Sequence, residues 1–377
     1  MKEKWPLLFA ALFTVLLLLG GCSGAATQAG TGGIEQKMTP EERADAMLAR
    51  MTPAEKIGQL LMIGVHGTEI NDDVRFMLSE YAVGGVILFD RNLETADGVR
   101  RFTKELQDAR HGELPLLIAI DEEGGPVARM KEILPPPPAQ SELGKSGDPV
   151  LARTWAKKTA KRLRDFGFNL NFAPVADVGD GERCYAGDAE TVAAFVHEAA
   201  AGYAEEKMLC TLKHFPGLGK GEADTHLDTV VVNADRDTLD AEDIVPFRAL
   251  INESGASDRF FVMTSHITYT ALDETLPASL SPAIMTSLLR KELGWRGVVV
   301  TDDLEMGAAD IFPFRELGVR AVEAGADIVL VCHEYKHQQE AFNGLLQALQ
   351  SGRLSEARIN DSVRRILRAK LTLEERK

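Results

Sequence analysis

The sequence predicts a single (β/α)8 barrel, and three observations lead to that fold class. Short runs of apolar and β-branched residues recur along the chain, each followed by a Gly-, Asp- or His-rich exit and an amphipathic helical stretch. There are eight such runs, which is the number that closes a parallel barrel. Polar residues mostly follow the runs, as expected at the carboxyl-end face of a barrel. An open, doubly wound sheet is the alternative.

The first residues of the 377-residue chain predict an export signal. A charged start is followed by an apolar run over 5–19, and Leu19-Gly20-Gly21-Cys22 resembles a bacterial lipobox. The run is shorter than the about 20 apolar residues that a membrane-spanning helix needs, although an uncleaved anchor remains an alternative. We therefore expect a lipoprotein signal peptide over 1–22 with lipidation at Cys22. The body would be exported and membrane-anchored, at the cell surface or the periplasmic face of a membrane.

Composition limits the partners of the mature chain. Residues 23–38 are rich in Gly, Ala, Thr and Gln, which suits a flexible tether. The formal net charge is -15 and becomes -16 once the leader, with two Lys and one Glu, is removed. A mature chain with this much negative charge repels nucleic acid, so we expect no nucleic-acid partner. The remaining cysteines, Cys184, Cys210 and Cys332, are odd in number and lack C-x-x-C spacing, so neither a disulfide framework nor a cysteine metal site is expected.

The barrel is expected to occupy residues 39–377. Thr39-Pro40-Glu41-Glu42 and Thr52-Pro53-Ala54-Glu55 each combine a Thr cap, a Pro at the first helical position and a Glu three residues after the cap, so each predicts a helix start. Residues 134–144, LPPPPAQSELG, are interpreted as a rigid loop, and residues 355–371 as a closing helix capped by Ser355. The predicted strands are 60–65, 83–89, 114–120, 166–175, 207–212, 258–264, 297–301 and 326–331.

Three kinds of side chain follow these strands and are expected to converge on one face. A neutral imidazole exchanges protons near pH 7, and a neighbouring carboxylate fixes its tautomer, as Asp224-Thr225-His226 would allow. A carboxylate such as Asp302 could attack an electrophilic carbon. The glycines of 213–229, KHFPGLGKGEADTHLDT, do not match a phosphate-binding Walker loop. The candidates are the carboxylates Asp121, Asp224 and Asp302, the imidazoles His214, His226 and His266, and the cations Arg129, Arg183 and Lys213.

The stretch KHFPGLGKGEADTH resembles the K-H-F-P-G-H-G-x4-D-S/T-H signature of family 3 glycoside hydrolases of the β-N-acetylhexosaminidase branch. Further matches occur in family order across nearly the whole mature chain, so together they are far more specific than one motif. They are GGVILF (84–89), DEEGGPVAR (121–129), NFAPVADV (171–178), ERCYAGD (182–188) and GVVVTDDLEMGA (297–308). The resemblance also implies a (β/α)8 barrel, in agreement with the strand count.

The resemblance implies a retaining reaction on non-reducing β-linked N-acetylglucosamine, with peptidoglycan fragments as the expected substrate. Asp302 would be the nucleophile, and His226, paired with Asp224, the general acid/base. No cofactor and no metal ion are implied, and the oligomeric state is left open. The positions that hold sugar hydroxyls or orient their neighbours in the family are Asp121, Arg129, Arg183, Lys213 and His214.

Several alternatives stay open. An imidazole base places less negative charge beside the acceptor than a carboxylate would, so a β-N-acetylglucosaminide phosphorylase is one alternative. Leu218 stands where the family has a His, and Cys184 where it usually has a Ser; Leu218 motivates a second alternative, a non-catalytic lipoprotein that binds cell-wall sugars. A metal-dependent barrel hydrolase and a β-glucosidase are weaker rivals, because the sequence lacks the His-x-His of the former and the second domain of many of the latter.

Other polar residues after the strands have structural interpretations. Single aspartates at such positions are commonly helix caps or loop acceptors, and we interpret Asp177, Asp180 and Asp303 in this way. His66, His266 and His333 are as consistent with structural roles as with site roles. Cys210 and Cys332 are expected to be inert core thiols.

Overall fold

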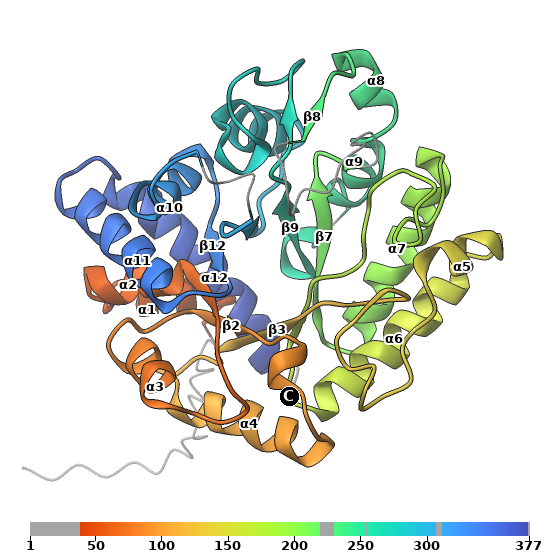
Figure 1. Cartoon of the computed structure of the whole chain (residues 1–377). Helices are drawn as coiled ribbons and strands as arrows, with labels where there is room; N and C mark the ends of the chain where they lie inside the picture. The colour runs from red at the N-terminus through yellow and green to blue at the C-terminus, as the bar shows by residue number, and fades with distance from the viewer. Residues whose placement is uncertain (1–37, 219–229, 254, 307–310, 376–377) are drawn as a thin grey trace, which may run out of the picture. The chain divides into compact units, whose positions relative to one another are not determined.

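The computed structural model describes residues 38–218, 230–253, 255–306 and 311–375. The described residues from Met38 onward form one compact unit, and Figure 1 shows its strands surrounded by helices. The residues Cys22, Asp224 and His226, for which the sequence predicts roles, lie outside the described residues.

Eight parallel strands close into a barrel, in the order β1-β12-β11-β9-β7-β6-β3-β2. Closure comes from β1, which pairs with β12 through Leu61 and Val329 and with β2 through Met62 and Gly85. The predicted barrel is therefore confirmed and the open sheet excluded. The strands are β1 (Leu61–Gly64), β2 (Gly85–Ile87), β3 (Leu117–Ile120), β6 (Leu170–Asn171), β7 (Leu209–Phe215), β9 (Phe260–Thr264), β11 (Val299–Asp303) and β12 (Ile328–Val331).

Helices follow the barrel strands and cover the outside of the sheet (Figure 1). The first and last helices meet, since α1 and α2 pack against α12 and α2 also packs against α11. The helices are α1 (Pro40–Leu48), α2 (Pro53–Gln59), α3 (Asp72–Ser79), α4 (Ala96–Ala109), α5 (Gln140–Lys145), α6 (Val150–Asp165), α7 (Ala189–Glu205), α8 (Arg236–Ala241), α9 (Val245–Ile251), α10 (Phe314–Ala324), α11 (Tyr335–Gln350) and α12 (Glu356–Glu375). Short 3-10 turns are η1 (Asp90–Asn92), η2 (Ala256–Asp258) and η3 (Ala278–Leu280), and η4 (Ala283–Glu292) is a π-helix.

The predicted helix starts are confirmed in detail. Thr39 accepts a hydrogen bond from the backbone N–H of Glu42, and Thr52 does the same for Glu55, with both reciprocal glutamate bonds present. Ser355 accepts from the N–H of Arg358 at 3.1 Å and so caps α12. Each cap satisfies backbone donors that the first helical turn leaves without a partner.

The interpretation of 134–144 as a loop is wrong for its second half, where α5 begins at Gln140. The Glu142 carboxylate accepts from the backbone N–H of Ala139 at 3.1 Å, so a local bond starts the helix although no Ser, Thr, Asp or Asn precedes it. Sequence reasoning gave the prolines of this stretch too much weight.

Two additional small sheets lie outside the barrel ladder. The antiparallel hairpin of β4 (Glu122–Gly124) and β5 (Val127–Ala128) follows β3, and β8 (Val231–Val232) pairs in parallel with β10 (Thr268–Tyr269). Within the barrel, the β7–β9 register shifts between Leu212 and Phe215, and the β11–β12 register shifts between Val300 and Asp303. Both irregularities fall where the strands end, and such irregularities redirect side chains.

No helix in the part of the chain that the structure describes is long and apolar enough to cross a membrane. Cys184 and Cys332 are free thiols, and Cys210 is buried inside β7 as expected of a core residue. Burial raises the pKa of Cys184 to about 12, with a further contribution from the Asp177 charge, so this thiol stays protonated at neutral pH.

Candidate active site

A pocket of about 710 Å³ opens at the carboxyl ends of the barrel strands. Its lining includes six residues predicted from the sequence, and they come from the segments after β3 and β6 and from the carboxyl-terminal parts of β7 and β11, as the fold prediction requires. The six are Asp121, Arg129, Arg183, Lys213, His214 and Asp302. The structure thus brings every described member of the predicted site into one cavity except His266.

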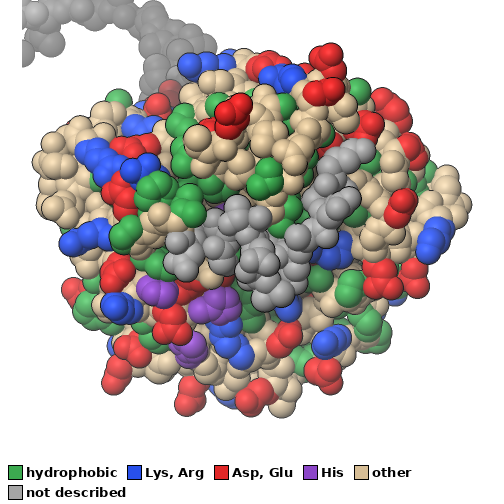
Figure 2. Space-filling model, turned by 45° about the horizontal axis from the view of Figure 1, so that its top comes forward, with side chains coloured by type: hydrophobic (Ala, Val, Ile, Leu, Met, Phe, Trp, Pro, Cys, Tyr) green, Lys and Arg blue, Asp and Glu red, His purple; other side chains and the backbone are tan. Residues whose placement is uncertain are grey.

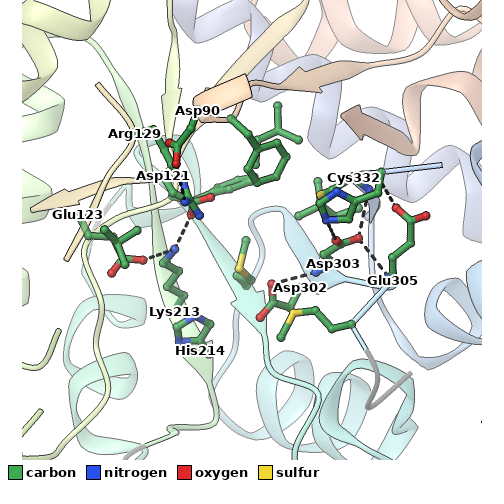
Figure 3. Close-up of a pocket in the computed structure, with 18 of the residues that line it drawn as sticks. Asp90, Asp121, Glu123, Arg129, Lys213, His214, Asp302, Asp303, Glu305 and Cys332 are labelled. Atoms are coloured by element: carbon green, nitrogen blue, oxygen red, sulfur yellow. Dashed lines mark hydrogen bonds and ion pairs between the residues drawn. The ribbon is translucent and has the colours of Figure 1, made fainter. Parts of the chain in front are cut away.

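Lys213 lies between two carboxylates in this pocket (Figure 3). Its Nζ is 2.7 Å from Oδ1 of Asp121 and 2.6 Å from Oε1 of Glu123, and its side chain is only 3% exposed. Burial would lower the pKa of Lys213, but the charges of Asp121 and Glu123 outweigh it and raise the pKa above its usual value. The ammonium group is therefore a permanent charge with a fixed position.

Glu123 also binds Arg183, which reaches it from the segment after β6. Nε and Nη2 of Arg183 donate to the two carboxylate oxygens at 2.8 and 2.9 Å in a bidentate pair. Burial would raise the pKa of Glu123, but the charges of Lys213 and Arg183 hold it at about 2. Two cations and two carboxylates are thus paired before any ligand binds.

His214 is held by Asp177, a buried carboxylate that follows β6. Oδ2 of Asp177 is 2.8 Å from Nδ1 of the His214 ring, and Oδ1 accepts from the His214 backbone N–H at 2.9 Å. Oδ1 also accepts from the N–H of Leu218 at 2.8 Å. The loop-acceptor interpretation of Asp177 is confirmed by the Leu218 bond but is incomplete, because the same side chain orients a pocket histidine.

Asp302, near the end of β11, lines the pocket together with Met263 and Met306. Its Oδ1 accepts from the backbone N–H of Asp303 at 2.8 Å. Burial would raise the pKa of Asp302, but the neighbouring imidazoles of His214 and His266 and the ammonium of Lys213 lower it below its usual range. The group is a carboxylate at neutral pH and has the form required of a nucleophile.

Another wall of the pocket is built by the ends of β2, β11 and β12. Asp303 accepts from the backbone N–H groups of Glu305 and Cys332, each at 3.1 Å, so its interpretation as a loop acceptor is confirmed. Asp303 also lies 3.2 Å from Nε2 of His333, and this hydrogen bond raises the pKa of His333. Histidine side chains gather among acidic and basic ones on the face shown in Figure 2.

Arg129 lies across the pocket from β11 (Figure 3). Its Nη1 is 3.6 Å from Oδ2 of Asp90, and its guanidinium lies 5.6 Å from the centre of the Phe89 ring. The buried Nε of Arg129 has no hydrogen-bond partner among the described residues. The ion pair of Arg129 is thus long and not bidentate, in contrast to the pair between Arg183 and Glu123.

Two further histidines considered from the sequence lie outside the pocket lining. His266 is buried, with Nδ1 at 2.6 Å from the Ser279 hydroxyl and Nε2 at 2.8 Å from the Asp303 carbonyl, so both ring nitrogens are used in structure. Nε2 of His66 is 2.7 Å from the carbonyl of His333.

Cys332 lines the pocket directly after β12 rather than inside the strand, and burial raises its pKa well above its usual value.

Sequence reasoning missed Glu123, Gln140 and the orienting role of Asp177. Gln140 on α5 donates to the carbonyls of Val175 and Arg183 and accepts from the N–H of Val175, which links α5 to the segment that carries Arg183. Glu123 stands inside the DEEGGPVAR match, so the motif contained the signal. The described residues include no group of three His, Cys, Asp or Glu side chains arranged to hold a metal ion.

A closed barrel with carboxylates and fixed cations converging at its strand ends is the architecture of a barrel enzyme. Residues 52–369 match the family model described as the glycosyl hydrolase family 3 N terminal domain. The chain belongs to this glycoside hydrolase family, and the resemblance predicted from its motifs is confirmed.

Named relatives agree with the family. The chain is 37% identical over 310 residues to a beta-hexosaminidase of Stenotrophomonas maltophilia, covering 79% of this chain and 89% of the relative. It is 32% identical to beta-hexosaminidase LpqI of Mycobacterium tuberculosis, covering 96% of each chain. A family 3 beta-N-acetylglucosaminidase structure from a Paenibacillus species superposes with a TM-score of 0.80 and 41% identity, covering 86% of this chain but only 62% of that longer one.

Proposed function

We propose that the chain is a retaining β-N-acetylhexosaminidase that releases N-acetylglucosamine from the non-reducing end of β-linked glycans. The observation that carries this proposal is the Asp302 carboxylate, which stands ionised at the end of β11 in a pocket with pre-paired cations. Family membership supports cleavage of a glycosidic bond, and the names of the relatives support a β-linked N-acetylhexosamine.

In the proposed reaction, Asp302 attacks the anomeric carbon while the bond to the leaving oxygen breaks, which gives a glycosyl-aspartate. His226, paired with Asp224, donates a proton to the leaving oxygen. In the second half the same imidazole takes a proton from water, which attacks the anomeric carbon and releases Asp302. Two inversions give net retention. The roles of His226 and Asp224 rest on the motif, because both residues lie outside the described part of the chain.

The remaining pocket groups are proposed to bind the sugar. Asp121, Lys213 and Arg183 are already held in ion pairs, so they need no rearrangement when hydroxyl groups arrive. Arg129 brings a pocket-lining guanidinium whose contact with Asp90 is long, at 3.6 Å, and His214 brings the ring nitrogen that Asp177 does not use. Charged partners of this kind give hydrogen bonds stronger than neutral ones.

We also propose the setting in which the enzyme works. Residues 1–22 would be a lipoprotein signal peptide ending at Cys22, residues 23–38 a tether, and residues 39–377 the catalytic barrel. An exported, anchored enzyme of this class would act on peptidoglycan fragments. Cys22→Ser should abolish labelling of the protein by a palmitate analogue and release it from membranes; a fully labelled mutant would refute the anchor.

The catalytic proposal is tested by trapping the covalent intermediate. The full chain is incubated with a fluorinated N-acetylglucosaminide that forms a slow glycosyl-enzyme, and the mass of the protein is followed. Wild type should gain one sugar, and Asp302→Ala should gain none. Glu132→Ala, at an exposed position, serves as the labelled control. Labelling of Asp302→Ala at the wild-type level would sink the assignment.

Turnover distinguishes the three forms of the proposal. Chromophore release from an aryl β-N-acetylglucosaminide in plain buffer, lost in Asp302→Ala and His226→Ala, supports the hydrolase. Formation of a sugar 1-phosphate when phosphate is added would instead define a phosphorylase, in which phosphate replaces water in the second half. Sugar binding without any turnover would leave a non-catalytic binding protein.

A further inference from the structure

Asp177 accepts three N–H groups with two oxygens, and this pattern determines the state of the His214 ring. Oδ1 receives the backbone N–H groups of His214 and Leu218 at 2.9 and 2.8 Å, and Oδ2 faces Nδ1 of His214 at 2.8 Å. Burial would raise the pKa of Asp177, but its contact with the His214 ring and the two backbone N–H groups lower it below its usual range. A carboxylate only accepts hydrogen bonds, so Nδ1 must carry a proton.

The second ring nitrogen faces a cation. Nη2 of Arg183 lies 3.5 Å from Nε2 of His214, and Arg183 is itself held by its bidentate pair with Glu123. A guanidinium only donates hydrogen bonds, so a proton on Nε2 would meet a donor of like charge. Nε2 is therefore the unprotonated nitrogen. At 3.5 Å the Arg183 contact is long for a hydrogen bond, which leaves the Nε2 lone pair available to a stronger donor.

We propose that Asp177 is a positioning residue that holds His214 in the neutral Nδ1–H tautomer, so that Nε2 accepts a hydrogen bond from a donor on the bound sugar. This inference rests on the proposed function for the identity of the ligand. A sugar hydroxyl or the amide N–H of an N-acetyl group has the required chemistry, whereas an ether oxygen does not. The site thus selects a ligand that donates at this position.

The same two oxygens make Asp177→Asn an informative variant. The backbone N–H groups of His214 and Leu218 require an acceptor at the Oδ1 position, so the Asn oxygen must occupy it. The Asn NH2 then faces Nδ1 and donates to it, which moves the ring proton to Nε2. The shape and packing are preserved, but the pocket nitrogen changes from acceptor to donor and faces Arg183.

The first measurement reads the tautomer without any substrate. Long-range 15N–1H spectra of the full chain labelled with 15N-histidine report which ring nitrogen carries the proton, and the His214→Asn spectrum assigns the signal. Wild type should be protonated at Nδ1, and Asp177→Asn at Nε2. A wild-type ring protonated at Nε2, or at both nitrogens near pH 7, overturns the proposal even if the variant does not fold.

The second measurement reads the consequence for the reaction. In Asp177→Asn, kcat/KM for an aryl β-N-acetylglucosaminide should fall about 10- to 100-fold, since a buried polar contact is lost and replaced by an unpaired donor. Asp180 lies in the same segment, but it is exposed. The same exchange of carboxylate for carboxamide there, Asp180→Asn, should keep wild-type kinetics. A shifted tautomer with unchanged kcat/KM refutes the pocket role of Nε2. If the spectra show the predicted tautomers but the wild-type protein does not turn over the substrate, the proposed function has failed and the tautomer assignment stands.

Discussion

Glu123 shows at the scale of one residue how the pocket holds its charges. Its side chain is 1% exposed and pairs with both Lys213 and Arg183. In Glu123→Gln these two neighbouring cations lose the negative charge that they share. We expect the free energy of unfolding at pH 7 to fall by about 3 kcal/mol, at the low end for a broken buried pair because Arg183 is partly exposed. Urea unfolding measures this change, and a loss within error of zero contradicts it.

The same carboxylate predicts how the effect depends on pH. The folded pKa of Glu123 is about 2, below its ordinary value of 4.5, so its contribution is complete above pH 4.5 and is lost as the pH falls toward 2. The difference between wild type and Glu123→Gln should therefore shrink on acidification. Glu132→Gln, at an exposed position in the same segment, should show no such difference at any pH. A difference that grows as the pH falls would reverse the sign and refute the account.

Single residues also show which parts of the site the sequence could predict. Asp121, Lys213 and Asp302 could be predicted, because each directly follows a strand that the sequence indicates, over 114–120, 207–212 and 297–301. Motif spacing could not separate Glu122 from Glu123, since neighbouring residues in β4 point to opposite sides and the sequence does not say which side is the pocket. Glu122 is not among the residues that line the pocket; it accepts from Met130 N–H at 3.0 Å, and burial raises its pKa to about 7.

At the scale of elements, the β4–β5 hairpin depends on a glycine, which has no side chain to contact a ligand. Gly124 has φ of +105°, and a Cβ there would lie 2.2 Å from the carbonyl oxygen of Pro138. Gly124→Ala should therefore displace the hairpin that places Glu123 and Arg129, and we expect kcat/KM to drop at least about 10-fold together with a lower Tm. Aryl glycoside kinetics and thermal unfolding check both effects.

Gly112 provides the matched control for that hairpin. It also has a positive φ, of +81°, but, apart from its two chain neighbours, no described residue has an atom within 4 Å of the place that a Cβ would occupy there. Gly112→Ala should cost only the left-handed backbone penalty of about 1 kcal/mol and leave kcat/KM unchanged. Equal kinetic losses in both alanine variants would show that the contact with Pro138 is not what matters.

Local signals predicted the elements best where one turn contains all the bonds. The capping boxes at Thr39 and Thr52 are such cases, because every partner lies within three residues. The start of α5 was harder to predict, because its local bond between Glu142 and Ala139 is combined with bonds from Gln140 to Val175 and Arg183, which are distant in the sequence. Tertiary bonds of this kind override local propensity, and they also connect α5 to the pocket.

At the scale of the whole molecule, barrel closure was predictable because it depends on the number of strands rather than on any one of them. The seam is where the two ends of the barrel meet, with β1 against β12 and α12 against α1 and α2. No sequence pattern indicated that an ionisable group lies buried in this seam. Lys370 on α12 is fully buried there, and its Nζ donates to Oε1 of Gln59 at 2.7 Å.

Lys370 therefore makes the stability of the whole barrel depend on pH. Burial, and then the Arg110 charge, lower its pKa from 10.5 to about 7, so between these values the unfolded chain holds a proton that the folded chain does not. The free energy of unfolding should rise with pH across this window by about 1.4 kcal/mol per pH unit from this group alone.

Lys370→Met isolates that contribution, because other groups that titrate in the window remain in both proteins. The variant leaves Oε1 of Gln59 without its donor, but an amide does not titrate, so this change shifts stability equally at every pH. Subtracting the unfolding free energies of the two proteins in urea, from about pH 7.5 to about pH 9.5, should reveal a gain of roughly 2–3 kcal/mol for wild type relative to the variant. Parallel profiles would show that Lys370 stays protonated in the fold, and would place water or an unexpected carboxylate beside the seam.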